Sequence, residues 1–266
     1  NNDTQLTITQ IIEDPDKASA NPMARMYGGG MELKMNEPIY FTTYNRTSKE
    51  NGLAMKEIKK KGIKKIVEGP YTFGNFMYSK GGKGKKPVFV YARGNFEEGN
   101  NLFASYDNFK TQKQLSDINP QQREYNWGTV ELVNWQTADD IFCEGLLFKP
   151  EDFDPNKKYP VMIYFYEKNA NTLYRHRNPT PSRSTVNIPY FVSNGYVVFV
   201  PDVYFTDGHP GQSAMKSIMP GVEMLEKTYP WIDGENMAIQ GQSWGGYQVA
   251  YMITQTNKFK AAGAGA

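Results

Sequence analysis

The stretch Gly241-Gln242-Ser243-Trp244-Gly245-Gly246-Tyr247 decides the fold predicted for this chain. The short apolar run 237–240 before it is typical of a buried strand, and the apolar run 249–253 after it is typical of a buried helix. Glycines two residues before and after Ser243 fit a tight connection, because a side chain at either position would clash with the neighbouring element. The sequence therefore predicts a sharp strand-to-helix turn that exposes the Ser243 hydroxyl near the positive end of a helix.

Gly-x-Ser-x-Gly between a strand and a helix is the nucleophile elbow of α/β-hydrolases, so Ser243 is the expected nucleophile of an acyl transfer. Backbone strain at such a serine pushes its hydroxyl clear of the sheet. Three fixed positions alone also occur by chance. The flanking strand and helix, together with Gly246 and Tyr247, strengthen the prediction. The alternative is a serine in an ordinary glycine-rich turn of an α/β domain.

Length and composition indicate a globular protein with room for two domains. The chain has 266 residues, of which 39% are apolar and 22% are charged. No apolar run approaches the length of a membrane span. The single cysteine, Cys143, excludes an intramolecular disulfide and a zinc cluster built from cysteines.

Basic residues concentrate in the first half. Residues 1–127 carry 19 Lys and Arg against 14 Asp and Glu, while the remainder carries 11 against 14. The excess lies in the lysine runs 59–61, 64–65 and 83–86. Nucleic-acid binding is one interpretation of such runs. Because these lysines alternate with glycines and not with stacking aromatic residues, we expect solvated loops and no nucleic-acid partner.

The first half contains short strand-like segments that recur at an offset of 49 residues. An apolar run follows Pro38 and another follows Pro87, which predicts strands at 39–43 and 88–92. Second strands are expected at 53–58 and 102–106, each followed by a short outer strand. A repeat of about fifty residues with several strands in each copy is typical of β-propeller blades. The alternative is two unrelated β-meanders of similar length.

The second half changes to a pattern of strands and helices, which predicts an α/β sheet. Segments 129–133 and 141–147 flank Asp139-Asp140 and read as a hairpin, so these two carboxylates are expected in a turn and not in acid–base chemistry. Nearly continuous apolar runs at 159–166 and 195–200 suit strands covered on both faces. A helix is expected over about 213–227, with Pro220 kinking or breaking it. The boundary between the halves is expected near 119–128.

With these elements in place, the chain resembles the prolyl oligopeptidase family of serine peptidases, in which a β-propeller is joined to an α/β-hydrolase domain. The resemblance is carried by four segments: Leu146-Leu147-Phe148-Lys149-Pro150 followed by Lys157-Lys158-Tyr159-Pro160, then Trp231-Ile232-Asp233, the elbow itself, and 103–117 as a final propeller blade. It implies partial propeller-like blades over 1–125 and the N-terminal part of an α/β-hydrolase domain over 126–266.

The resemblance also implies roles for single residues. Ser243 would attack the acyl carbonyl, and the backbone N–H of Trp244 would donate to the oxyanion. In the dipeptidyl peptidase branch a tyrosine hydroxyl at the end of the strand after a Tyr-Pro entry supplies the second donor, which corresponds to Tyr166 here. Gly241, Gly245 and Gly246 would form the elbow. The alternative for Tyr166 is an aromatic residue packed at a strand end.

Two departures from the family pattern stand out. The stretch Asp202-Val203-Tyr204-Phe205 has no arginine where the family often has Asp-x-Arg-Gly. After Ser243 the sequence has no acid and no histidine, although the fold places both triad partners after the serine. His176 and His209 lie in loops upstream and are not expected to act as the base. The triad Asp and His are therefore expected beyond Ala266, and this chain alone is expected to be nearly inactive.

The resulting hypothesis is a serine peptidase that hydrolyses short peptides through an acyl-enzyme at Ser243. It needs no cofactor and no metal. Its expected partners are the peptide substrate and the remainder of the hydrolase domain. Two alternatives stay open: an esterase or lipase that shares the elbow, and a catalytically silent module that binds peptides or a partner protein.

Overall fold

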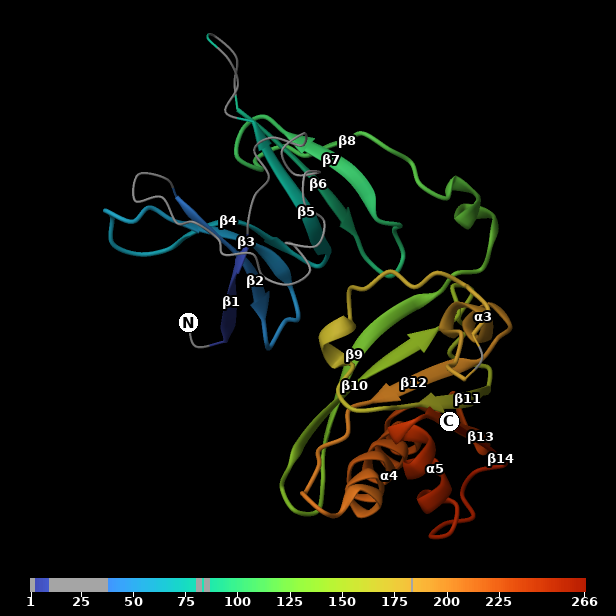
Figure 1. Cartoon of the computed structure of the whole chain (residues 1–266). Coiled ribbons are helices and arrows are strands. Elements are labelled where there is room, and N and C mark those ends of the chain that lie inside the picture. Colours follow the sequence, from blue (N-terminus) through green and yellow to red (C-terminus); the bar gives the residue numbers. More distant parts are fainter. Residues whose placement is uncertain (1–2, 10–37, 80–82, 84–86, 183) are drawn as a thin grey trace. The chain divides into compact units, whose positions relative to one another are not determined.

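The computed structural model describes residues 3–9, 38–79, 83, 87–182 and 184–266 (Figure 1). The chain divides into two compact units. The first unit comprises Asn1–Pro120 and Tyr174–His176, and the second comprises Gln121–Leu173 and Arg177–Ala266. Each unit is described by itself below. The assignment of residues 1–125 to a partial propeller and of 126–266 to a partial hydrolase domain stays a prediction.

The first unit consists of two four-stranded antiparallel sheets whose strands follow the order of the chain. The first sheet contains β1 (Thr4–Thr9), β2 (Ile39–Asn45), β3 (Asn51–Lys56) and β4 (Lys64–Gly69). The second contains β5 (Thr72–Ser79), β6 (Val88–Gly94), β7 (Asn101–Ser105) and β8 (Lys113–Gln114). In the first sheet Ile39 pairs with Lys56, and in the second Val90 pairs with Ala104.

The structural repeat matches the recurrence in the sequence. The predicted strands at 39–43 and 88–92 correspond to β2 and β6, and those at 53–58 and 102–106 correspond to β3 and β7. Each sheet has a further first strand, β1 or β5, that the sequence pattern missed. The sequence of β5 shows no regular alternation of apolar and polar residues, because the strand itself is irregular. Asn75 adopts a positive φ of 52°, and the pairing register shifts between Gly74 and Met77.

Aromatic side chains form the core of the first unit. The buried members are Leu53, Phe76, Phe89, Tyr91, Phe103 and Phe109. The rings of Tyr91 and Phe109 lie 4.8 Å apart, and those of Tyr40 and Phe89 lie 6.4 Å apart. Because Tyr40 belongs to β2 and Phe89 to β6, this core joins the two sheets.

The second unit is built on a six-stranded sheet with the order β14-β13-β11-β12-β10-β9. Its strands are β9 (Thr129–Gln136), β10 (Phe142–Lys149), β11 (Tyr159–Tyr164), β12 (Val197–Pro201), β13 (Ile232–Gln242) and β14 (Ala261–Gly265). Strands β12, β11, β13 and β14 pair in parallel, whereas β9 and β10 form an antiparallel hairpin. The predicted hairpin and the three predicted strands are thus confirmed, and β12 is buried at every residue.

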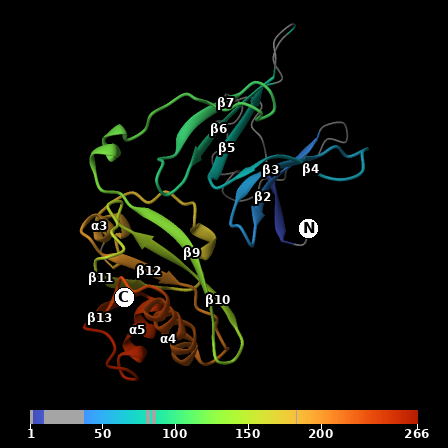
Figure 2. The same cartoon turned by 180° about the vertical axis from the view of Figure 1, so that it is seen from behind.

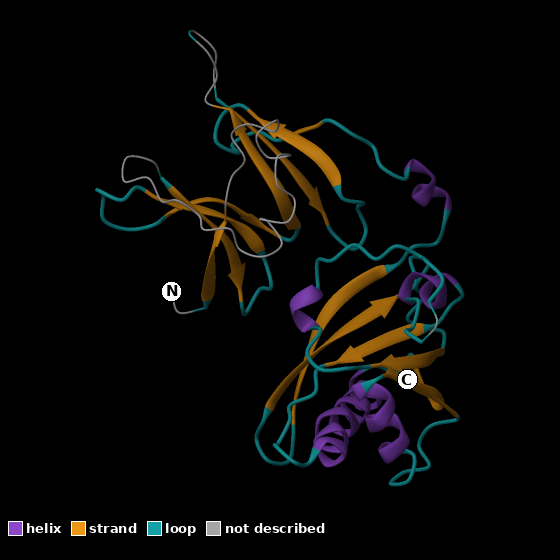
Figure 3. Ribbon diagram, viewed as in Figure 1, coloured by secondary structure: helices purple, strands orange, loops and turns teal. Residues whose placement is uncertain are grey.

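The helices are η1 (Pro120–Glu124), which begins at the last residue of the first unit, and, within the second unit, η2 (Ala170–Thr172), α3 (Ile188–Ser193), α4 (Pro210–Thr228) and α5 (Trp244–Met252). α4 and α5 lie side by side against the sheet in both views (Figure 1, Figure 2). The ribbon coloured by secondary structure shows the same pair of helices beneath the strands (Figure 3). Val222 on α4, Met252 on α5 and Ile163 on β11 belong to one buried core.

Pro220 does not break the predicted helix, which runs from Pro210 to Thr228. A proline removes one backbone hydrogen bond from a helix interior. The apolar face that contains Ala214, Ile218, Val222 and Leu225 is fully buried in the core, and this packing outweighs the local penalty. Of the two predicted effects of Pro220, the break is therefore wrong, whereas the kink stays a prediction.

All four tryptophans of the sequence lie in the second unit. Trp127, Trp135 and Trp231 are buried, whereas Trp244 is 37% exposed. The indole N–H of Trp135 donates to the carbonyl oxygen of Ser217 at 2.8 Å, which fixes β9 to α4. Within the described ranges of the chain, no helix is both long and apolar enough to cross a membrane.

Candidate active site

The turn at Ser243 has the geometry that the sequence predicts. β13 ends at Gln242 and α5 begins at Trp244, so Ser243 alone forms the connection. Its backbone adopts φ 55° and ψ −113°, a conformation that is strained for any residue with a side chain. Ser243 is exposed. The fold therefore holds its hydroxyl at the surface, at the N-terminal end of a helix.

Three glycines make this turn possible. A Cβ atom on Gly241 would lie 2.3 Å from the carbonyl oxygen of Gly245, and one on Gly245 would lie 2.4 Å from that of Phe165. A Cβ atom on Gly246 would lie 2.1 Å from the carbonyl oxygen of Gly265. All three contacts are with backbone, which cannot move aside as a side chain can. Each glycine is thus required by a specific close approach.

Tyr166 lies in the segment 165–170, which follows β11 and which we call the Tyr166 loop. Its side chain is 38% exposed. The Tyr166 carbonyl oxygen accepts a hydrogen bond from Nε2 of Gln248 at 3.3 Å. A Cβ atom on Gly245 would lie 3.6 Å from the Tyr166 Cα. The fold therefore brings the backbone of Tyr166 against the first turns of α5, the helix that begins beside Ser243.

Trp244 is the first residue of α5. The N–H groups in the first turn of an α-helix have no partner within that helix and carry partial positive charge. The Trp244 indole is stacked with the ring of Tyr247 at 5.9 Å and lies 5.8 Å from that of Phe205. All three aromatic side chains are exposed. They form an apolar surface next to Ser243, which we call the aromatic surface.

Asp202 is a buried acid at the carboxyl end of β12, and the sequence reasoning gave it no role. Its side chain is 3% exposed. Its Oδ1 accepts hydrogen bonds from the backbone N–H of Asn169 at 2.5 Å and of Ala170 at 2.9 Å. Burial is the largest effect on the pKa of the Asp202 carboxyl and raises it, and the nearby Glu144 raises it further. The two backbone hydrogen bonds and the nearby Lys168 act in the opposite direction, and the net shift is upward. The available signal was a single acid after an apolar run, at the strand end where α/β sheets place their sites.

Both histidines lie outside helices and strands. Nδ1 of His176 lies 3.2 Å from the carbonyl oxygen of Asn95, and His176 belongs to the first unit. His209 is exposed and precedes the first turn of α4, where its carbonyl oxygen accepts from the Ser213 hydroxyl at 2.7 Å. That neither histidine acts as the base stays a prediction.

The predicted Asp139-Asp140 turn is also present. Asp140 has a positive φ of 57°, and its N–H donates to the carbonyl oxygen of Thr137 at 3.1 Å. Asp139 forms an ion pair with Lys216 of α4. Among the residues that the structure describes, no group of three His, Cys, Asp or Glu side chains has an arrangement suited to a metal ion.

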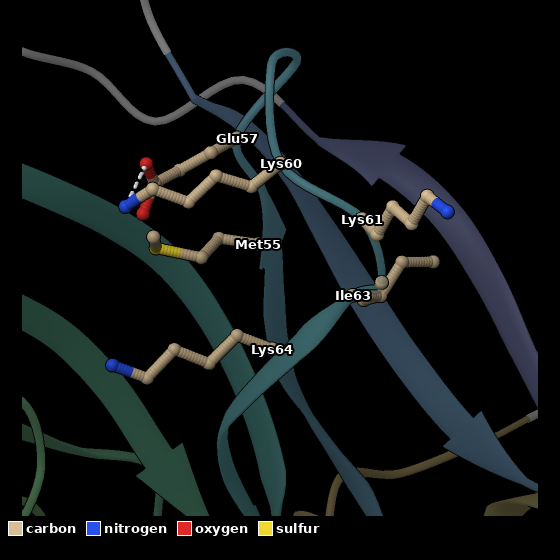
Figure 4. A pocket seen from close by; sticks show the side chains of 7 residues that line it. Met55, Glu57, Lys60, Lys61, Ile63 and Lys64 are labelled. Carbon is tan, nitrogen blue, oxygen red and sulfur yellow. Dashed lines mark ion pairs between the residues drawn. The ribbon is translucent and has the colours of Figure 1, made fainter.

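The β3–β4 hairpin of the first unit carries a separate pocket (Figure 4). It is lined by Met55, Glu57, Lys60, Lys61, Gly62, Ile63 and Lys64. Lys60 pairs with Glu57 at 2.7 Å, and nearby Lys65 pairs with Glu68 at 2.5 Å. Two lysines of this hairpin thus pair with acids of the same chain, whereas Lys85 and Lys86 of the third run lie outside the described residues. That the chain binds no nucleic acid stays a prediction.

A parallel sheet flanked by helices, with a strained and exposed serine between a strand and a helix, defines an α/β-hydrolase fold. Residues 181–266 match the model of the prolyl oligopeptidase family. Dipeptidyl peptidase 8 of Mus musculus is 28% identical over 148 residues, which cover 51% of this chain and 16% of that protein. Dipeptidyl-peptidase 5 of Porphyromonas gingivalis is 23% identical over 244 residues, or 84% of this chain and 32% of that protein.

Solved structures share the fold. An acylaminoacyl peptidase in complex with Z-Gly-Gly-Phe-chloromethyl ketone superimposes with a TM-score of 0.61 at 19% identity, over 85% of this chain and 35% of that one. These findings make the chain similar to the prolyl oligopeptidase family, whose model matches residues 181–266. It spans between 16% and 35% of the length of the three relatives named here.

Proposed function

We propose that the complete protein is a serine peptidase and that Ser243 is its nucleophile. The observation that carries the proposal is the backbone of Ser243, which holds an exposed hydroxyl on a strained turn with φ 55°. Strain of this kind persists where the surrounding structure fixes it, and it gathers at active sites. The Ser243 oxygen attacks the carbonyl carbon of the scissile bond, the amine leaves with a proton, and water hydrolyses the acyl-enzyme.

Two groups stabilise the oxyanion in this proposal. One is the backbone N–H of Trp244, because the residue after the nucleophile supplies one donor in this fold. The other is the hydroxyl of Tyr166, whose backbone is held against α5 by Gln248. Removing one such donor lowers kcat by roughly 10²- to 10³-fold. Tyr166→Phe in the complete protein should therefore lower kcat within that range and leave KM nearly unchanged.

The general base and the acid that orients it come, in this proposal, from a part of the protein outside these 266 residues. Support comes from the absence of any histidine or acid after Ser243 in this sequence, and from relatives that are roughly three times as long as this chain. Loss of triad members typically lowers the rate by about 10⁴- to 10⁶-fold. The 266-residue chain alone should therefore hydrolyse peptides slower than the complete protein by a factor of that order.

The proposed substrates are short peptides with an apolar residue at the cleaved bond. The named relatives are peptidases, which favours peptide bonds over esters. The aromatic surface of Phe205, Trp244 and Tyr247 offers exposed apolar area beside the nucleophile. Phe205 lies where the family pattern often has the glycine of Asp-x-Arg-Gly, which supports an apolar contact at this place.

A fluorophosphonate probe tests the nucleophile. The complete protein should be labelled, and peptide mapping should find the label on Ser243. Ser243→Ala should abolish labelling. Ser184→Ala is the matched control, because Ser184 lies against Gly265 at the edge of the same sheet and should leave labelling unchanged. Absence of label on a folded wild-type protein, or labelling that survives Ser243→Ala, would contradict the proposal.

A matched panel of peptide anilides and acyl esters tests the substrate class. Cleavage of the anilides that disappears in Ser243→Ala would support the peptidase. Ester hydrolysis without anilide cleavage would favour an esterase that shares the elbow. Binding of peptides without turnover in the complete protein would favour the silent binding module.

A further inference from the structure

Asp202 combines three properties that call for an explanation. It is charged at neutral pH when unperturbed, it is 3% exposed, and it lies at the carboxyl end of β12 on the same side of the sheet as the Ser243 turn. Charged side chains are almost never fully buried unless they are paired or bonded. The groups that meet the Asp202 carboxylate therefore show what it does.

Those groups are the backbone of the Tyr166 loop. Oδ1 of Asp202 accepts from the N–H of Asn169 at 2.5 Å and from that of Ala170 at 2.9 Å. Next to it, the N–H of Val203 donates to the carbonyl oxygen of Glu167 at 2.9 Å. Three hydrogen bonds thus join the segment after β12 to the loop, and Asp202 is the only one of the donors and acceptors that uses a side chain.

The other side of the loop is fixed by α5. Nε2 of the fully buried Gln248 donates to the Tyr166 carbonyl oxygen at 3.3 Å. The backbone of Tyr166 is therefore held between α5, which begins beside Ser243, and the segment that follows β12. The Tyr166 side chain itself remains 38% exposed, so its direction depends on the backbone that carries it.

We propose that Asp202 is a positioning residue for the reaction proposed above: its carboxylate fixes the Tyr166 loop and so holds the Tyr166 hydroxyl toward the oxyanion site beside Ser243. The inference rests on the proposed function. An apolar side chain at this position would leave the N–H groups of the half-buried Asn169 and the buried Ala170 without this acceptor. A carboxylate makes stronger, shorter hydrogen bonds to N–H groups than a neutral acceptor does.

A double-mutant cycle in the complete protein tests the inference. Asp202→Ala should lower kcat by roughly 10- to 100-fold with KM nearly unchanged, because a misplacement of about 1 Å has effects of this size. Asp202→Asn keeps an acceptor oxygen of the same shape and should restore most of kcat. In a Tyr166→Phe background, Asp202→Ala should produce no further loss, because the hydroxyl that it positions is already gone.

Ser217→Ala is the matched control for a merely structural effect. Ser217 is also buried, and its hydroxyl oxygen accepts from the N–H of Tyr204 at 3.1 Å, so it holds the same segment after β12 without touching the Tyr166 loop. This variant should lower the melting temperature and leave kcat unchanged. Independent, multiplicative losses of kcat for Asp202→Ala and Tyr166→Phe would overturn the inference, as would an unchanged kcat in Asp202→Ala.

Amide hydrogen exchange separates this inference from the proposed function. Exchange at Asn169 and Ala170 should accelerate in Asp202→Ala and stay slow in Ser217→Ala, whatever the catalytic activity. Unchanged exchange at both amides would refute the role of Asp202 even in an active peptidase. If exchange accelerates while the wild-type protein is not labelled at Ser243, the proposed function is contradicted. The result would still show that Asp202 fixes the Tyr166 loop.

Discussion

The backbone N–H of Ser243 donates to the carbonyl oxygen of Gly265 at 2.8 Å, which joins the turn after β13 to the end of β14. The pairing of the two strands continues up to this bond, since Gln242 pairs with Gly265 in parallel register. On the helical side, the N–H of Tyr247 donates to the Ser243 carbonyl oxygen at 3.1 Å. Both polar backbone groups of Ser243 are thus bonded, and its strained conformation is fixed from the sheet and from the helix.

Gly246→Ala should destabilise the second unit by about 2–3 kcal/mol, because overpacking against atoms that cannot shift has effects of this size. The new Cβ atom would lie 2.1 Å from the Gly265 carbonyl oxygen. Urea unfolding followed by tryptophan fluorescence measures the loss. Gly263→Ala is the control: its Cβ atom would meet the flexible side chain of Gln240 at 3.1 Å, so its effect should be small. Equal stabilities of the two variants would contradict the assigned contact.

Ser243→Gly should be more stable than Ser243→Ala by about 1 kcal/mol, since a residue with a Cβ atom is strained at φ 55° and glycine is not. Both variants lack the hydroxyl, so the comparison isolates the backbone. Thermal unfolding of the two proteins under identical conditions provides the measurement. If the alanine variant proves the more stable of the two, the turn is not strained in solution.

The stability of the protein should depend on pH through Asp202. Burial raises the pKa of this carboxyl, while Glu144 adds to the shift and Lys168 opposes it. An acid with a raised pKa binds its proton more tightly when folded, so its contribution is fully present below the unfolded pKa of about 4 and is lost as pH rises through the folded pKa. Relative to Asp202→Asn, the wild type should therefore lose free energy of unfolding as the pH increases from about 4 toward neutrality.

Urea unfolding of wild type and Asp202→Asn over a series of pH values tests this trend. Cys143 and Tyr204 also lie near Asp202, but burial is the largest cause that raises their pKa values, to about 11 and about 12 respectively. They keep their protons throughout the acidic and neutral range. A difference in stability that stays constant with pH would mean that the folded protein does not shift the Asp202 pKa.

Cys143 should resist thiol reagents until the second unit unfolds. Its side chain is fully buried on β10, and burial raises the pKa of its thiol to about 11. At pH 8 roughly one thiol in a thousand would be ionised, and the thiolate is the form that reacts. The labelling rate measured against urea concentration should rise along the unfolding transition. Rapid modification of the native protein would show that β10 opens locally.

The buried strands and the elbow could be predicted because their signals are local. The apolar run that became β12 is buried on both faces, and the run that became β11 is buried on one face and half-buried on the other, which leaves a nearly continuous apolar pattern in the sequence. β13 begins at Ile232, five residues before the predicted start, because its first residues 233–236 are polar and partly or fully exposed. The turn could be predicted from the glycines around Ser243, because each of them occupies a position where a side chain would clash with neighbouring backbone.

The role of Asp202 could not be predicted, because its partners lie far away along the chain. The N–H groups that it accepts belong to Asn169 and Ala170, which are 33 and 32 residues earlier. The hydrogen-bond donors are backbone N–H groups, which nearly every residue type has. The residue types at 169 and 170 therefore give no sign of a bond to Asp202. The fold has to be known before this contact can be seen.

The distribution of indole rings gives this protein an internal optical probe. Trp127, Trp135, Trp231 and Trp244 all belong to the second unit, and three of them are buried. Fluorescence excited at a wavelength that only indole absorbs therefore reports on the second unit alone. The tyrosines of the first unit are not excited at that wavelength. Comparing that emission with far-ultraviolet dichroism would reveal whether the two units melt together or one after the other.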